Sequence, residues 1–176
     1  ANNSYDHFKA SYKNGASDGK TTWYSVTGKV LVEGNFINNK RDGLWTWYHD
    51  NGKVRKTIMY KLGEVHGAIK EYAENGQLIY DANYENGNAQ GIISHYYENG
   101  KLEYQSNYMD DKRHRKMVSY ALDGSVQQYR YYEKGVLISY SYLDKSGKEV
   151  APIVIGAGKS EIVTYYQSGS KSVEQT

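Results

Sequence analysis

Apolar and polar residues alternate along stretches of this chain. Leu78, Tyr80, Ala82 and Tyr84 occupy every second position of one stretch, and the residues between them are mostly polar. Alternation with a period of two is typical of a β-strand with one face buried. Neighbouring stretches such as "LWTWYHD" and "IISHYYE" are rich in aromatic and β-branched residues, which also favour strands. No window shows a sustained helical period, so the pattern predicts an all-β chain.

The two kinds of strand recur with a fixed period. A Gly stands at residues 28, 52, 76, 100 and 124, each 24 residues after the last, and the series continues at 147 and 169 with slightly shorter spacing. Counting each repeat from its Gly as position 0, position 2 is aliphatic, position 8 is aromatic and position 20 is Tyr in most repeats. The rings at positions 8 and 20 are predicted to form the core. A period of this length indicates stacked supersecondary units.

Glycines also predict the connections. Three of the repeat glycines follow Asn, and Asn-Gly between two strands favours a type I′ turn, in which both central residues have positive φ. Further glycines at positions 11 and 15 predict a loop between the two strands of each repeat. A single repeat buries too little to be stable alone. We therefore expect an elongated single-layer antiparallel β-meander, built from two-stranded repeats of about 24 residues.

The repeat pattern also predicts the domain organisation. It covers residues 4–150 as one array. Residues 151–176 form an irregular segment, "VAPIVIGAGKSEIV", followed by a partial further repeat, and a bend or break is expected between the two blocks.

Composition narrows the function. A net charge of +2 is too small to indicate nucleic-acid binding, and no apolar run approaches the length of a membrane span. The absence of Cys excludes disulfides and thiol nucleophiles but leaves the compartment open. The first residue is Ala rather than Met, so an upstream segment is expected, either a signal peptide or the rest of a longer protein.

The phrases "GLWTWYHDNGKV", "GAIKEYAENGQLIYDANYENG" and "GIISHYYENGKLEYQSNY" resemble the MORN-repeat variant of bacterial YwqK-family antitoxins. The resemblance covers about residues 4–150 and returns weakly at 161–173. It implies an elongated, non-enzymatic interaction module of bacterial origin. No cofactor is expected, and the localisation stays open between the cytoplasm and the cell envelope. MORN repeats at large are linked with scaffolding, dimerisation and membrane phospholipids, and the antitoxin name implies a toxin as partner.

Two motifs are weaker than they look. "IGAGKS" at residues 155–160 ends like a phosphate-binding loop, but Ile153 stands where the motif needs its first Gly, and the residues that follow read as a strand. The five His residues lack the spacing of a metal site. We therefore predict neither a nucleotide site nor a metal site.

A basic run, "KRHRK", fills the predicted loop of the Gly100 repeat, where Asp111 and Arg115 replace the loop glycines. It is either an anion contact or a solvated loop that protects the sheet from aggregation. The residues are Lys112, Arg113, His114, Arg115 and Lys116.

Aromatic residues of the second strand supply the candidate partner-binding surface. They are Trp23, Trp45, Trp47, His95 and Tyr97. If exposed, such rings would suit either a protein partner or the stacking of sugars from a glycan or cell-wall polymer. Alternation alone does not say which face is wet. An enzyme is the weakest interpretation, because nothing places Ser, Asp and His together, and unpaired terminal strands allow an edge-to-edge homodimer.

Overall fold

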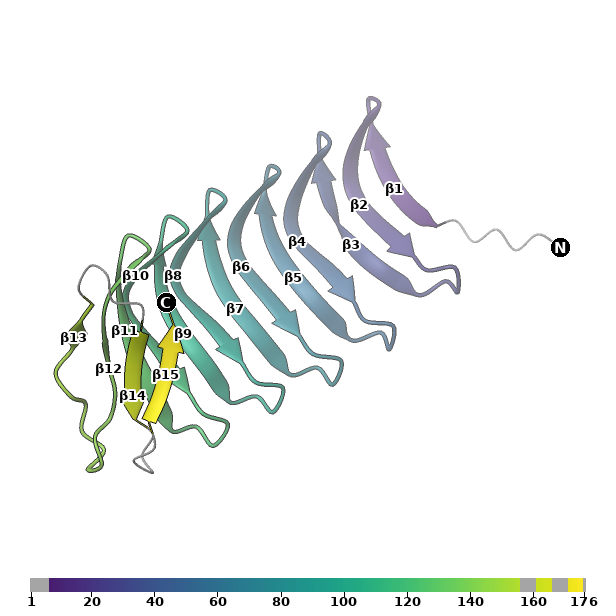
Figure 1. The fold of residues 1–176 in the computed structure, drawn as a ribbon. Coiled ribbons are helices and arrows are strands. Elements are labelled where there is room, and N and C mark those ends of the chain that lie inside the picture. The colour runs from purple at the N-terminus through teal and green to yellow at the C-terminus, as the bar shows by residue number, and fades with distance from the viewer. Residues whose placement is uncertain (1–6, 156–160, 166–170, 176) are drawn as a thin grey trace. The chain divides into compact units, whose positions relative to one another are not determined.

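The computed structural model describes residues 7–155, 161–165 and 171–175, and every regular element in these ranges is a β-strand (Figure 1). The described chain divides into two compact units, which meet between Asn88 and Ala89. The all-β prediction is confirmed. The division at Asn88 falls inside a repeat, whereas the predicted boundary at residue 150 stays a prediction. Most of the "IGAGKS" motif lies outside the described residues.

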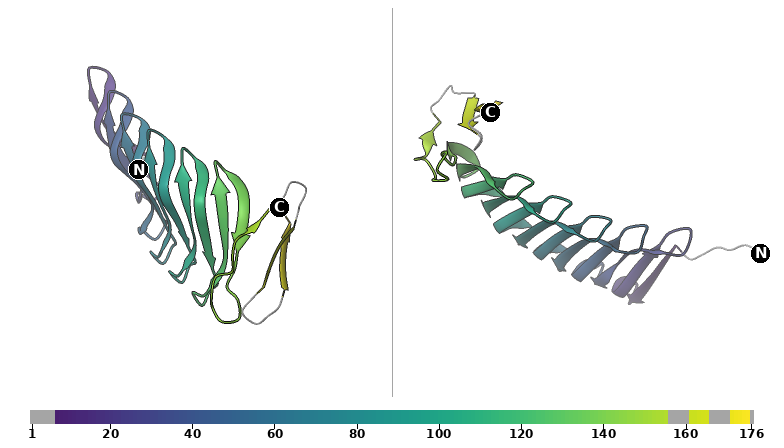
Figure 2. Two further views of the ribbon diagram at one scale, coloured as in Figure 1. Left: turned by 90° about the vertical axis from the view of Figure 1, so that its left-hand side faces the viewer. Right: turned by 90° about the horizontal axis from the view of Figure 1, so that it is seen from below.

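The first unit is an antiparallel meander in which each strand pairs with the next along the chain. Its strands lie in one layer in the right-hand view of Figure 2. They are β1 (Phe8–Lys13), β2 (Ala16–Tyr24), β3 (Val30–Ile37), β4 (Lys40–Tyr48), β5 (Val54–Lys61), β6 (Glu64–Tyr72) and β7 (Leu78–Glu85).

The second unit continues the pattern from β8 to β13, again in chain order. Two further strands pair only with each other and form a separate sheet. The strands are β8 (Asn88–Tyr96), β9 (Leu102–Met109), β10 (Lys112–Tyr120), β11 (Val126–Glu133), β12 (Val136–Ser141), β13 (Ile153–Val154), β14 (Glu161–Tyr165) and β15 (Lys171–Gln175). The predicted antiparallel meander is confirmed.

The Asn-Gly turns between repeats are not of the predicted type. His49 N–H donates to Lys53 O at 2.8 Å, and Gly52 N–H donates to His49 O at 2.8 Å, which closes a loop of three residues. Among the described residues of this loop, Gly52 has positive φ and Asn51 does not. This combination fits a type I turn followed by a left-handed Gly. Asn51 is favoured because its Oδ1 accepts a hydrogen bond from Lys53 N at 2.9 Å.

The type I′ turns instead join the two strands within each repeat. Between β3 and β4 the two connecting residues Asn38 and Asn39 have φ of 47° and 65°. Both central residues of a type I′ turn must be left-handed, and Gly or Asn meets that requirement at least cost. Positive φ at both connecting residues recurs at Asn14 and Gly15, Leu62 and Gly63, Asn86 and Gly87, Asp110 and Asp111, and Lys134 and Gly135. The glycines at position 11 therefore serve a two-residue hairpin.

The second strand of the repeat carries a bulge, which is seen in β2, β4, β6, β10 and β12. Ile58 pairs with Ile69 and Tyr60 pairs with Val65, so three residues of β6 lie opposite one residue of β5. Gly67, at position 15, has a φ of 113° inside this bulge. Bulges bend a strand, and the strands of the first unit are curved in Figure 1. The glycines at position 15 thus belong to a strand, and so does the basic run of the Gly100 repeat, which was predicted to be a loop and lies in β10.

Arg115 occupies the bulge position that Gly holds elsewhere, with a φ of 67° and an exposed side chain. A left-handed conformation costs a residue with a Cβ roughly 1–2 kcal/mol. We therefore expect Arg115→Gly to raise the free energy of unfolding by about 1 kcal/mol, as measured by urea denaturation. Arg115→Ala, which keeps the Cβ, is the control and should give little gain. An equal gain from both variants would show that charge, not backbone strain, is responsible.

The core is a row of residues across the middle of the sheet. Positions 6 and 17 face each other in neighbouring strands, as in the pairs Trp45–Ile58, Ile69–Ala82 and Ile93–Ser106. These residues and Met117 are buried. The prediction that positions 8 and 20 form the core holds only in part, because Tyr132 is buried while the other aromatic residues at these positions are mostly half-buried. The centre of a curved strand is covered by its neighbours more fully than its ends are.

Candidate functional site

Aromatic rings gather on one face of the first unit, which we call the aromatic face. Trp45 is their centre: its ring centroid lies 5.5 Å from that of Trp23, 5.0 Å from Phe36, 6.1 Å from Trp47 and 6.2 Å from Tyr60. These residues come from β2, β3, β4 and β5, so the cluster exists only because consecutive strands pair in this register. The ring planes meet at angles between 39° and 81°, and the rings therefore interlock.

Trp45 itself is fully buried, with an exposed fraction of 0%. Its indole N–H donates to Asn35 O at 3.1 Å, and its ring packs against the backbone of Gly34. A Cβ built on Gly34 would lie 2.3 Å from an atom of that ring, so only Gly fits there. Trp45 was predicted to be a partner-binding residue. The structure corrects this, because Trp45 is covered by its neighbours and has no exposed surface for a partner to contact. Its role is to support the other rings of the cluster.

Arg41 completes the aromatic face. Its guanidinium carbon lies 4.5 Å from the ring centre of Trp45, 5.9 Å from that of Trp47 and 5.4 Å from that of Tyr60. One of its nitrogens, Nη1, donates to Tyr60 Oη at 3.1 Å. The residue is half-buried. The alternation pattern missed Arg41 as part of this cluster, although its repeat position, shared with Arg113, was a signal.

The other predicted partner-binding residues fall into two places. Trp23 and Trp47 are half-buried and join the aromatic face. In the second unit, His95 stacks on Tyr104 with ring centres 4.2 Å apart, and Tyr97 Oη donates to Tyr120 O at 2.7 Å. Their role in binding stays a prediction.

The basic run does not form one cluster. Lys112 and Arg115 are exposed, whereas Arg113 lies among rings and donates from Nε to Tyr108 Oη at 3.1 Å. Lys116 Nζ lies 2.8 Å from Glu149 Oε2. His114 Nδ1 is buried without a hydrogen-bond partner.

Lys116 therefore has a counter-charge. Tyr131 Oη also donates to Glu149, at 2.5 Å from Oε1. Burial opposes ionisation of Glu149, but the hydrogen bonds from Lys116 and Tyr131 prevail and lower its pKa. Lys116, one of the five residues of the predicted anion contact, is thus already paired with Glu149. The anion contact as a whole stays a prediction.

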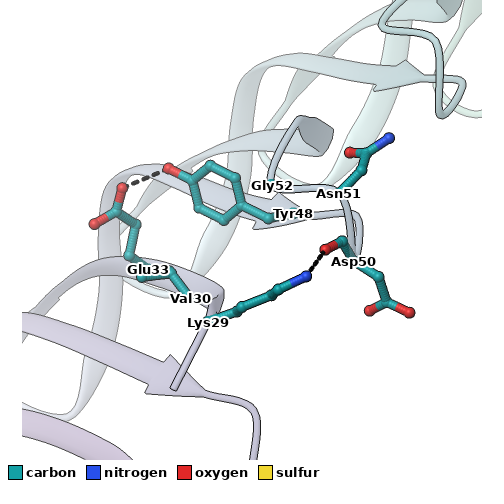
Figure 3. Close-up of a pocket in the computed structure, with 7 residues that line it drawn as sticks. All are labelled: Lys29, Val30, Glu33, Tyr48, Asp50, Asn51 and Gly52. Atoms are coloured by element: carbon teal, nitrogen blue, oxygen red, sulfur yellow. Dashed lines mark hydrogen bonds between the residues drawn. The ribbon is translucent and has the colours of Figure 1, made fainter. Parts of the chain in front are cut away.

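A hollow of about 460 Å³ lies on the opposite face of the first unit (Figure 3). Its lining residues are Lys29, Val30, Glu33, Tyr48, Asp50, Asn51 and Gly52. Val30 stands at position 2 of its repeat, and simple alternation along β3 would put it on the same face as Val32 and Phe36. The extra residue of β3 opposite the Trp23–Tyr24 step changes that alternation, and Val30 lines the hollow with Tyr48.

Two hydrogen-bonded groups dominate the hollow. Tyr48 Oη donates to Glu33 Oε1 at 2.6 Å, and Lys20 Nζ lies 2.8 Å from Glu33 Oε2. The hydrogen bonds from Lys20 and Tyr48 lower the pKa of Glu33. Burial and the bond to Glu33 raise the pKa of Tyr48 to about 12. Both groups are thus held in one protonation state at neutral pH, which suits a structural role.

The depressed pKa of Glu33 makes a prediction about pH. Because this pKa is lower in the folded than in the unfolded chain, the stabilisation is present above the ordinary value of 4.5 and is lost as the pH falls through the folded pKa. We expect Glu33→Gln to lower the free energy of unfolding by roughly 1 kcal/mol at neutral pH. Urea denaturation in a series of buffers should show this difference shrinking toward zero in acid. Glu64→Gln, at an exposed position, is the control; a Glu33→Gln effect that persists in acid would contradict the ion pair.

Lysines at position 1 tie neighbouring repeats together at the inter-repeat turns. Lys29 Nζ donates to Asp50 O at 2.6 Å, Lys53 Nζ to Asn75 O at 2.7 Å, and Lys101 Nζ to Asp123 O at 3.0 Å. Asn51 Nδ2 adds a bond to Glu74 O at 2.8 Å. The polar lining of the hollow is therefore largely engaged in stacking the repeats.

The part of the chain that the structure describes contains neither a metal-binding cluster nor a membrane-spanning helix. No three or more His, Asp or Glu side chains come together there as a metal site would require. Nor do these residues include a helix that could cross a membrane.

The comparison with protein families finds one match. The model of the MORN repeat variant matches residues 41–62, 65–86 and 89–110, three segments that start 24 residues apart and so keep the period of the glycines. No curated protein matches the sequence significantly. MORN repeats indicate a repeat-type binding module. Residues 41–110 therefore match three consecutive MORN repeats of the variant type.

Proposed function

We propose that this chain is a non-enzymatic binding or scaffold module that holds another polypeptide on the aromatic face. The supporting observation is the cluster in which buried Trp45 carries half-buried Trp47 and Tyr60, with Arg41 lying over the rings. Trp, Tyr and Arg are the residues that most often dominate the binding energy of protein interfaces. Rings fixed by their neighbours lose little entropy when a partner binds.

The arrangement of the rings favours a polypeptide over a glycan. Stacking of a sugar requires an open, flat ring face. On the aromatic face Phe36 and Tyr60 meet Trp45 edge to face, at 81° and 76°, the Trp rings are tilted against each other, and Arg41 lies over three of the rings. In the second unit, His95 and Tyr104 use their faces on each other at an interplanar angle of 17°.

We infer binding without catalysis. Glu33 and Tyr48 line the hollow of the first unit, but they hydrogen-bond each other and are held away from the pKa range of an acid or base at neutral pH. The hollow is also open to solvent on a single-layer sheet, whereas active sites are usually enclosed.

The class of partner follows from the resemblance to bacterial antitoxins, which favours a toxin polypeptide. A second copy of the chain is an alternative at the outer edge of β1, where Phe8 and Tyr12 are exposed. A strand added to this edge would cover these rings as β4 covers Phe36 in β3.

Affinity capture with matched variants tests the proposal. Wild-type chain, Trp47→Ala and Leu44→Ala are immobilised and exposed to lysate of the source organism, and bound proteins are identified by mass spectrometry. Leu44 is the control, because it is 50% exposed and points away from Trp45 on the opposite face. A protein retained by the wild type and Leu44→Ala but lost from folded Trp47→Ala supports the proposal. Equal retention by all three contradicts the aromatic face, and binding only to a polysaccharide panel would establish the glycan alternative.

A further inference from the structure

Each unit contains an arginine embedded among rings at the same repeat position. Arg41 and Arg113 both stand at position 13, three repeats apart, and each follows a lysine. The corresponding residues of the repeats between them, Val65 and Ala89, are apolar. The two arginines thus give these two repeats a positively charged group at position 13, which the two repeats between them lack.

Arg41 has unused hydrogen-bonding capacity. A guanidinium group has five N–H donors, and within the described chain Arg41 uses Nη1 toward Tyr60 Oη. No carboxylate of the described residues forms an ion pair with it: Glu33 pairs with Lys20, and Glu71 pairs with Lys56. The neighbouring Asp42 accepts a hydrogen bond from Leu62 N. Arg41 is therefore a half-buried cation that has no counter-charge among the described residues, and the rings around it hold it in place.

Arg113 repeats this environment independently in the second unit. Its guanidinium carbon lies 6.0 Å from the ring centre of Tyr108 and 5.5 Å from that of Tyr132, and Nε donates to Tyr108 Oη. It too forms no ion pair with a described residue. Burial opposes its charge, yet the surrounding tyrosines raise the pKa of Arg113. An arginine side chain stays protonated in proteins, so Arg41 and Arg113 each place a positive charge in a half-buried position.

The group that matches such a site is a carboxylate. The planar fork of a guanidinium binds the two oxygens of a carboxylate in parallel, and partial burial strengthens that bond relative to water. Lys40 and Lys112 precede the two arginines and are exposed, but adjacent residues of a strand point to opposite faces, so neither lysine belongs to these sites. The rings around each arginine would also contact apolar groups of a ligand. A polypeptide can supply acidic and apolar side chains together.

We propose that Arg41 and Arg113 bind side-chain carboxylates of an acidic segment of the partner, one in each unit. This inference rests on the proposed function, since it specifies the chemistry of the polypeptide that the aromatic face holds.

The test uses a short fluorescein-labelled peptide that alternates Glu with Leu, and the same peptide with Gln in place of Glu. Binding to the full chain is followed by fluorescence anisotropy. We expect the Glu peptide to bind at least about tenfold more tightly, and Arg41→Gln combined with Arg113→Gln to remove that preference. Arg41→Lys combined with Arg113→Lys should restore only part of it, because Lys keeps the charge but lacks the planar fork.

Arg55→Gln is the matched control, since Arg55 is an exposed arginine of the same sheet. If this variant loses as much affinity for the Glu peptide as Arg41→Gln combined with Arg113→Gln does, the attraction is diffuse and the inference is wrong. Equal binding of the Glu and Gln peptides also overturns it. So does binding of anionic lipid vesicles or polyuronate in place of either peptide, and so does no binding at all. A captured partner that needs Trp47 but not Arg41 or Arg113 would overturn this inference alone and leave the proposed function standing.

Discussion

Trp45→Ala is expected to lower the free energy of unfolding by roughly 3–5 kcal/mol, which is the usual range for truncating a buried Trp. The indole is fully buried, its N–H is bonded to Asn35 O, and it touches four other rings. Removing the indole leaves a void between β3, β4 and β5. Because the sheet is a single layer, no second layer of side chains can move in to fill this void. Urea denaturation followed by far-ultraviolet circular dichroism measures the loss.

Trp47→Ala provides the comparison, because Trp47 is a residue of the same type, in the same strand, and only half-buried. It should cost about 1 kcal/mol, the central value for point substitutions. If the two variants lose equal stability, Trp45 is not the support of the aromatic face and the burial argument is wrong. The contrast also separates a binding defect from an unfolding defect in the capture experiment.

Gly34→Ala is expected to cost about 3 kcal/mol, the upper end for overpacking in a core. The φ of Gly34 does not require glycine, so the penalty arises from space alone: the added Cβ would lie 2.3–2.6 Å from three atoms of the Trp45 ring. The indole cannot withdraw without breaking its hydrogen bond to Asn35 O. Thermal and urea denaturation should both show the loss.

A paired substitution tests the cause. The same contact is made by Ile58 against Ile69 and by Ser106 against Met117 in later repeats. Gly34→Ser combined with Trp45→Met copies the second of these pairs. The double variant should be more stable than the sum of its two single variants predicts, by more than about 0.5 kcal/mol. Additive losses would show that the Gly34–Trp45 contact does not set the cost.

These pairs explain why the core row was predicted only in part: alternation placed Ala82 on the buried face, but position 6 was not recognised as a core position. Position 6 is occupied by Gly, Ile, Ala, Ser and Arg in successive repeats, a set with no common hydrophobicity. What the residues share is a fit to the size of the side chain on the next strand, as when Gly34 accepts Trp45. Size matching between residues far apart in the chain leaves no periodic signal in the sequence. The regular tyrosines at positions 8 and 20 leave a strong periodic signal, but these tyrosines are mostly only half-buried.

The turns show the same limit at a shorter range. Asn-Gly at residues 51 and 52 satisfies a type I′ turn, but the pair lies in a three-residue loop in which only Gly52 is left-handed. The type I′ turns lie instead at pairs such as Leu62 and Gly63, where the first residue carries no turn signal. The register of the flanking strands decided which turn forms at each site.

The sequence alone determined the repeat, its period, the strand content and the absence of thiol chemistry, because these depend on local spacing and composition. Only the tertiary structure decided which residues are covered, where the bulges lie, and that Arg41 and Arg113 lie among rings while Lys116 is paired with Glu149. The physical reason is that burial and charge pairing are set by neighbours from other strands. In a meander with bulges, a shift of one residue in strand register changes those neighbours, and the alternation of side chains along a single strand does not record it.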